Sequence, residues 1–169
     1  MLTKGYKVYL IRIPSGPTPI ITQVISEAPV FTVETGKCQI NGQLPDKNCT
    51  PGSIDPRVTQ DNIHQTICVQ GYTGKVRPPV GYTNKLKMQQ IKEYGYLETN
   101  PTLYEEDHLI SLELGGNPTD PKNLWPEPGK APNPKDKIEN LCHKKVCKGE
   151  IPLADAQRQI AENWTTACK

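Results

Sequence analysis

Hydrophobic residues recur at helical spacing near the end of the chain, which predicts a C-terminal helix over about 153–167. A second helix is predicted over about 135–148, with Asn133 as its N-cap. A third is predicted over about 85–94, where Gly95 stops it. The C-terminal helix presents one core-facing stripe of Leu153, Ala156, Ile160 and Trp164, spaced three, four and four residues apart.

The middle of the chain predicts strands. Residues 103–110 favour a short strand, residues 115–118 (Gly-Gly-Asn-Pro) a turn, and residues from 123 a second strand. Residues 71–82 and the cysteine-containing stretch 36–57 predict loops, and Thr59 begins a short helical pattern. Residues 1–35 alternate only weakly and are interrupted by proline, so we expect an N-terminal extension, weakly structured or with edge strands, before a single domain over 36–169.

Composition narrows the class of protein. The 169 residues include 17 Pro and 13 Gly, only 35% are hydrophobic, and mean hydropathy is −0.60. Pro and Gly interrupt every stretch, and no apolar run approaches the roughly 20 residues that span a bilayer. These features exclude a long-helix bundle and a membrane protein. They predict a small, loop-rich α+β domain with short helices, stabilised by cross-links.

Six cysteines at irregular spacing predict disulfides formed in an oxidising compartment. We therefore expect a secreted protein, although residues 8–11 are too short an apolar run for a signal-peptide core. The alternative is a zinc-stabilised domain that uses Cys142, His143 and Cys147. Six cysteines allow 15 pairings, and the sequence does not choose among Cys38, Cys49, Cys68, Cys142, Cys147 and Cys168.

Charge is unevenly distributed although the formal net charge is only +2. Residues 75–92 hold five basic side chains and no acid, residues 93–121 hold seven acids and no base, and residues 130–148 hold six lysines against two acids. One interpretation is solvated surface charge. The other is a cation site flanked by lysines that bind phosphate. Glu105 and Glu106 are either auxiliary acids of that site or, as we expect, exposed residues that deepen the negative potential of the acidic block.

The acidic block contains a pair suited to phosphodiester hydrolysis. Asp107 and His108 are adjacent on a predicted strand, so their side chains point to opposite sides. A carboxylate on one side can bind a cation, while an imidazole on the other deprotonates water near neutral pH. Asn140 and His143 are three apart on a predicted helix, and either or both can complete the coordination of the metal.

The stretch Asp107-His108-Leu109-Ile110, followed by a Gly-Gly turn and by Asn-Leu fifteen residues after the histidine, resembles the HNH (ββα-metal) nuclease motif. The resemblance covers roughly residues 36–168 and extends to a group of small, exported bacterial-type proteins with Cys-Thr-Pro-Gly and Asp-Pro-Arg-Val-Thr segments, here at 49–52 and 55–59. It implies two antiparallel strands and a helix, over about 103–148, that enclose one divalent cation.

The resemblance also implies roles for individual residues. His108 would be the general base, Asn123 would orient it, and Asp107 would bind Mg²⁺ or Mn²⁺, with Zn²⁺ as a less suitable ion. The second metal ligand would be His143 or Asn140. Both stay candidates because the gap from Asn123 to His143 is 20 residues, longer than usual for the motif. The expected activity is hydrolysis of DNA, with RNA as an alternative substrate. Phosphate contacts are expected from Lys137, Lys144 and Lys145.

Two other functions are compatible with the same residues. One is an inactive HNH-like module that binds nucleic acid or another protein. The other is the zinc-stabilised domain described above. Trp125 can stack on a base or belong to the core beside the motif, and burial is the more usual place for such a residue.

Overall fold

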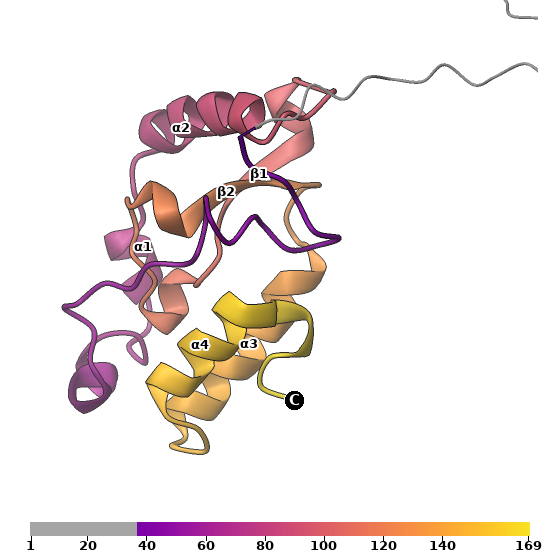
Figure 1. The fold of residues 1–169 in the computed structure, drawn as a ribbon. Helices are drawn as coiled ribbons and strands as arrows, with labels where there is room; N and C mark the ends of the chain where they lie inside the picture. The colour runs from indigo at the N-terminus through magenta and orange to yellow at the C-terminus, as the bar shows by residue number, and fades with distance from the viewer. Residues whose placement is uncertain (1–36) are drawn as a thin grey trace, which may run out of the picture. The chain divides into compact units, whose positions relative to one another are not determined.

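The computed structural model describes residues 37–169, which belong to one compact unit. In this part of the chain, a two-stranded antiparallel sheet is combined with short helices and three disulfides, which confirms the expected α+β class. The sheet lies between α2 (Val80–Glu93) on one side and α3 (Pro134–Cys147) with α4 (Leu153–Asn163) on the other (Figure 1). The expected extension over residues 1–35 and its edge strands fall on residues 1–36, outside the described part.

The sheet pairs β1 (Tyr104–His108) with β2 (Leu124–Pro128). Its register sets Asp107 opposite Trp125 and Glu105 opposite Glu127. Residues directly opposite in an antiparallel pair share a face of the sheet. The two predicted strands are therefore confirmed, and the register places Glu105 and Glu127 side by side on the face that also carries Asp107.

The connection between the strands contains two short 3₁₀ helices, η3 (Leu112–Leu114) and η4 (Pro121–Asn123), with the expected turn between them. Gly115 adopts φ +71°, a left-handed conformation that favours glycine. Gly116 lies so close to the end of β1 that a Cβ atom on it would be 1.8 Å from the carbonyl oxygen of Ile110. The loop thus folds tightly back onto β1.

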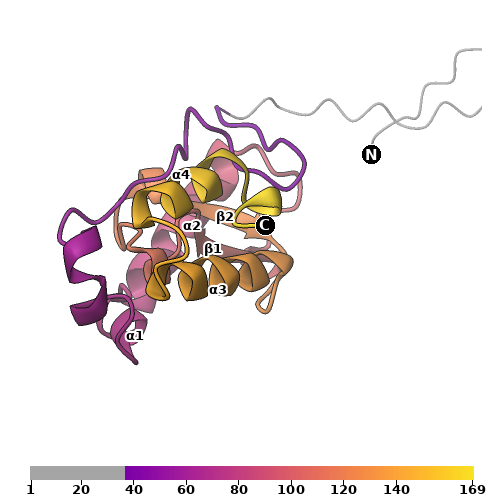
Figure 2. The ribbon, with the colours of Figure 1, turned by 90° about the horizontal axis from the view of Figure 1, so that it is seen from below.

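Helix α3 begins as predicted, because the Asn133 side chain accepts hydrogen bonds from the backbone N–H groups of Lys135 and Asp136. Helix α4 buries the predicted stripe, with Leu153, Ala156, Ile160 and Trp164 all at most 3% exposed. A short 3₁₀ helix, η5 (Trp164–Thr166), follows it, so the predicted 153–167 helix is two elements. Figure 2 views these helices from below, with the strands visible between them.

The sequence predicted the part before β1 less well. Residues 72–76 form a short helix, α1 (Tyr72–Val76), where a loop was expected. Helix α2 begins at Val80, after two prolines, and not near residue 85. Thr83 therefore lies inside the helix, where its hydroxyl donates to the carbonyl of Val80 at 3.1 Å. The predicted end at Gly95 is confirmed, as is the short helix after Thr59, η1 (Gln60–Gln65).

All six cysteines are oxidised, as Cys38–Cys49, Cys68–Cys147 and Cys142–Cys168. The zinc alternative is therefore wrong in this state, because Cys142 and Cys147 belong to different disulfides. Three disulfides in so small a domain indicate an oxidising, extracellular type of environment. Among the described residues, none of the helices has both the length and the apolar character needed to cross a membrane.

Candidate functional site

His108 stands at the end of β1 and is only 5% exposed. Its Nε2 lies 3.0 Å from the carbonyl oxygen of Pro118 in the loop between the strands. A carbonyl only accepts hydrogen bonds, so Nε2 carries the hydrogen and Nδ1 keeps a lone pair. Burial lowers the pKa of His108 below its ordinary value, which keeps the ring neutral at physiological pH.

Asn123 holds the loop that supplies this carbonyl. It is fully buried, its Oδ1 accepts from the backbone N–H of Ile110 at 3.0 Å, and its Nδ2 donates to Ile110 O and Asn117 O, each at 3.0 Å. The Ser53 backbone also donates to Oδ1, at 3.3 Å. Asn123 therefore ties the end of β1 to the residue just before Pro118. The structure brings His108 and Asn123 to the same loop, as expected.

Asp107 points to the opposite side of β1, toward α3, where a lysine meets it. The Nζ of Lys135 donates to Asp107 Oδ2 at 2.7 Å, to the carbonyl oxygen of His108 at 2.7 Å, and to Glu139 Oε1. Lys135 is 1% exposed. Burial alone would lower the pKa of Lys135, but its attraction to Asp107 and Glu139 outweighs burial and raises that pKa.

More carboxylates surround this lysine. Asn133 Nδ2 lies 3.2 Å from Glu105 Oε2 and 3.3 Å from Glu127 Oε2, so the N-cap of α3 bridges the two strands. Burial, and then repulsion by Asp107, raises the pKa of Glu127 to about 8. Burial likewise raises the pKa of Glu139 to about 7. The cluster is thus rich in carboxyl groups whose protonated form burial favours, and Lys135 is its buried cation.

The face of β1 that carries His108 also carries Glu106. Both carboxylate oxygens of Glu106 are buried without a hydrogen-bond partner, and burial raises its pKa to about 8. The expectation that this residue is an exposed acid is therefore wrong, because α2 covers its face of the sheet. Lys87 of α2 donates to the carbonyl of Tyr104 at 3.1 Å, and its charge partly offsets the effect of burial on Glu106.

The two expected helix ligands do not join Asp107. Asn140 is exposed, and its Nδ2 donates to the carbonyl of Asp136 within α3. His143 lies two turns, about 12 Å along the helix, beyond Lys135. Its Nε2 is 2.9 Å from the carbonyl oxygen of Ile67, and its Nδ1 is 4.0 Å from Glu113 Oε2.

His143 instead lies beside a disulfide. Ligand atoms of Cys68, His143 and Cys147 are within 4.8 Å of one another, but both sulfur atoms are bonded in Cys68–Cys147. A disulfide sulfur is not a thiolate, and the thiolate is the metal ligand. This Cys/His group is therefore not a metal site while the disulfide is intact.

The expected Mg²⁺ or Mn²⁺ fits these residues poorly. Asp107 faces an ammonium group that already has three oxygen partners, and neither Asn140 nor His143 contacts Asp107. The residues that sequence reasoning missed are Lys135 and Glu139. Together with Cys142 and Val146 they are spaced four, three and four residues apart, which marks the buried side of α3.

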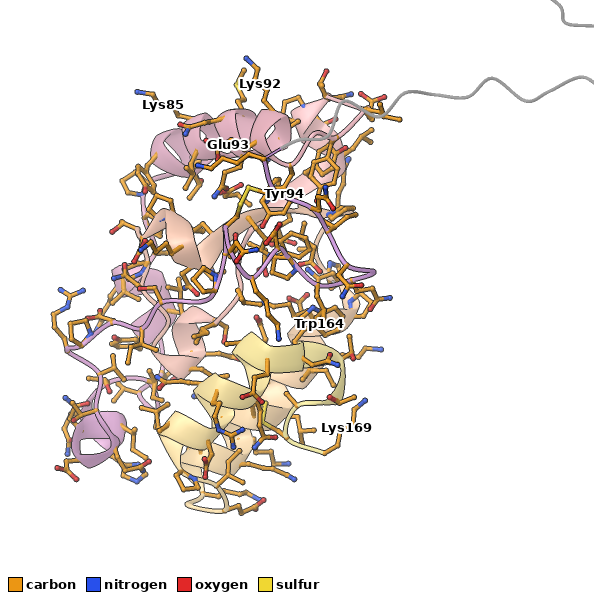
Figure 3. The ribbon with its side chains drawn as sticks, viewed as in Figure 1. Lys85, Lys92, Glu93, Tyr94, Trp164 and Lys169 are labelled. Atoms are coloured by element: carbon orange, nitrogen blue, oxygen red, sulfur yellow. A yellow bond between two sulfur atoms is a disulfide. The ribbon has the colours of Figure 1, made fainter. Side chains whose placement is uncertain are left out.

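Basic side chains project from two helices, α3 and α2. Lys137 and Lys144 are exposed and Lys145 is partly exposed on α3. Lys85 and Lys92 project from the side of α2 turned away from the domain, in the orientation shown in Figure 3. Trp125 is 1% exposed and packs against Tyr94, with ring centroids 6.2 Å apart, so it belongs to the core and does not stack on a base.

The chain matches no protein-family model, no curated protein and no solved structure. The HNH assignment is therefore a prediction from the sequence motif alone.

Proposed function

We propose that the protein is an HNH-type endonuclease that hydrolyses phosphodiester bonds of DNA, with His108 as the general base. The observation that carries this proposal is the 3.0 Å contact between His108 Nε2 and Pro118 O, which directs the proton to Nε2 and leaves Nδ1 as the base. The lowered pKa of His108, caused by burial, supports the same role.

In the proposed reaction, His108 Nδ1 takes a proton from water. The oxygen of that water bonds to phosphorus, and the bond from phosphorus to the leaving oxygen breaks. The leaving oxygen takes a proton from solvent, and His108 then releases its own proton to solvent. Asn123 acts as a positioning residue, because it holds the loop whose carbonyl orients the ring.

Substrate contacts are proposed for Lys137, Lys144 and Lys145 of α3. These contacts address phosphates, so we expect little sequence preference and binding that weakens steeply with salt. RNA offers the same phosphates and is the second substrate to assay. We assign no step to a divalent cation, because the expected ligands do not converge. The three disulfides support the further proposal that the protein is secreted.

The test is cleavage of supercoiled plasmid by the wild-type protein, by His108→Ala and by His64→Ala, in Mg²⁺, in Mn²⁺ and in EDTA. His64 is an exposed histidine on η1 and serves as the matched control. We expect His108→Ala to lose about 10²- to 10⁴-fold in rate and His64→Ala to keep the wild-type rate. Equal cleavage by His108→Ala and the wild type would refute the mechanism.

One observation favours the alternative of an inactive binding module. Asp107, the expected metal ligand, is engaged by the buried ammonium group of Lys135 at 2.7 Å and does not meet either expected helix ligand. If none of the proteins cleaves plasmid or RNA under any condition, while the wild type binds DNA in a salt-dependent manner, the module is the better description.

A further inference from the structure

We infer that the ammonium group of Lys135 is the resident cation between β1 and α3, and that it fills the position at which a divalent metal ion is expected. The inference rests on the contacts of Lys135 and does not depend on nuclease activity. Three oxygens surround Nζ: Asp107 Oδ2, the carbonyl oxygen of His108, and Glu139 Oε1.

The hydrogen bonds of this ammonium are complete. A lysine ammonium has three N–H donors, and here each has its own oxygen acceptor. Both carboxylate partners are also largely buried, with side chains 14% exposed for Asp107 and 12% for Glu139. Removing one partner of such a buried group leaves an uncompensated charge, so this arrangement resists exchange with ions from solvent.

The same three oxygens are the type of ligand that Mg²⁺ and Mn²⁺ prefer. They come from two separate segments, the end of β1 and the first two turns of α3, so they converge only in the folded chain. A metal ion bound to Asp107 Oδ2 would lie next to the ammonium group of Lys135. That group cannot reach water unless the buried aliphatic part of the Lys135 side chain also becomes exposed. Lys135 and a divalent cation therefore exclude each other at this position.

Lys135 also acts on the catalytic candidate. By bonding the backbone carbonyl of His108, the ammonium fixes the end of β1 from the α3 side, while Pro118 fixes the imidazole from the loop side. Lys135 is thus a positioning residue. It gives the strand–helix junction an internal cation that does not depend on metal supply.

The test is binding of Mn²⁺ to the full chain, measured by electron paramagnetic resonance, for wild type, Asp107→Asn, Lys135→Ala and Lys135→Ala/Asp107→Asn. We expect the wild type and Asp107→Asn to bind Mn²⁺ equally, because the wild type has no Mn²⁺ site at Asp107. We expect Lys135→Ala to gain one site per chain, and the double variant to lose it. Thermal unfolding should agree: Mn²⁺ raises the Tm of Lys135→Ala and leaves that of the wild type unchanged.

Two results would overturn the inference. One is a wild-type Mn²⁺ site that disappears in Asp107→Asn, and the other is a folded Lys135→Ala that gains no site. If Lys135→Ala does not fold, ¹⁵N spectra of lysine ammonium groups in the wild type decide. A slowly exchanging ammonium signal that millimolar Mg²⁺ leaves unchanged supports the inference, whereas its loss or displacement by Mg²⁺ contradicts it.

Discussion

The Asn123 side chain and the backbone of Ile110 hydrogen-bond each other in both directions. Oδ1 accepts from Ile110 N and Nδ2 donates to Ile110 O, both at 3.0 Å. This pair closes the loop between the strands one residue beyond Leu109, whose own N–H bonds the carbonyl of Asn123. The loop carbonyl that orients His108 depends on this closure.

Replacing Asn123 should therefore damage the whole loop. Asn123→Ala leaves buried backbone groups of Ile110 and Asn117 without partners, and we expect a loss of about 3–5 kcal/mol in the free energy of unfolding. Asn140→Ala is the matched control, because Asn140 is exposed, and it should cost less than about 0.5 kcal/mol. Urea unfolding measures both. Similar losses for the two variants would show that the closure is unimportant.

Gly116 should tolerate no side chain. A Cβ atom would lie 1.8 Å from Ile110 O and 2.8 Å from Asn123 Nδ2, so Gly116→Ala must move the end of β1. We expect a soluble yield too low to purify, or destabilisation of more than about 3 kcal/mol. Gly81→Ala in α2, where a Cβ would meet nothing within 4 Å, should stabilise by up to about 1 kcal/mol. A Gly116→Ala protein as stable as the wild type would contradict the described loop.

The contribution of Glu106 to stability should decrease as pH rises from about 4.5 to about 8. Burial raises the pKa of Glu106 from 4.5 to about 8, so in this window the folded state keeps a proton that the unfolded state has lost. The free energy of unfolding then falls with pH, by at most about 1.4 kcal/mol per pH unit for this group.

Glu106→Gln keeps the shape of the side chain and removes its titration. We expect the variant to gain stability over the wild type progressively toward pH 8, measured by urea unfolding at several pH values. Glu162→Gln, at an exposed position of α4, should show the wild-type dependence. A pH dependence of Glu106→Gln that parallels the wild type would mean that Glu106 is solvated.

His108 should titrate below its ordinary pKa and as the Nε2–H tautomer. Burial disfavours the imidazolium form, and the Pro118 carbonyl accepts the Nε2 hydrogen. Two-bond ¹H–¹⁵N spectra recorded against pH report both properties, with the exposed His64 as an internal comparison. If the plasmid is cleaved, the acidic limb of kcat/KM should follow the same pKa. An Nδ1–H tautomer in the neutral ring would remove the proposed base.

The sequence alone determined most of the local elements. Asn133 defined the start of α3, Gly95 the end of α2, and the three- and four-residue spacing of Leu153, Ala156 and Ile160 the buried face of α4. These features depend on neighbours within one or two helical turns, so a linear pattern contains them. The adjacency of Asp107 and His108 likewise sufficed to place their side chains on opposite sides of a strand.

Only the tertiary structure decided the partners of these residues. Lysine is rarely buried, so the residue type of Lys135 favours solvent, yet α3 packs against β1 and brings Lys135 to Asp107 across 28 residues. The disulfide pairing also required the fold, because Cys68 meets Cys147 across 79 residues. Packing of α2 over β1 buries Glu106. Each of these outcomes is a long-range contact between elements, and local periodicity carries no information about such contacts.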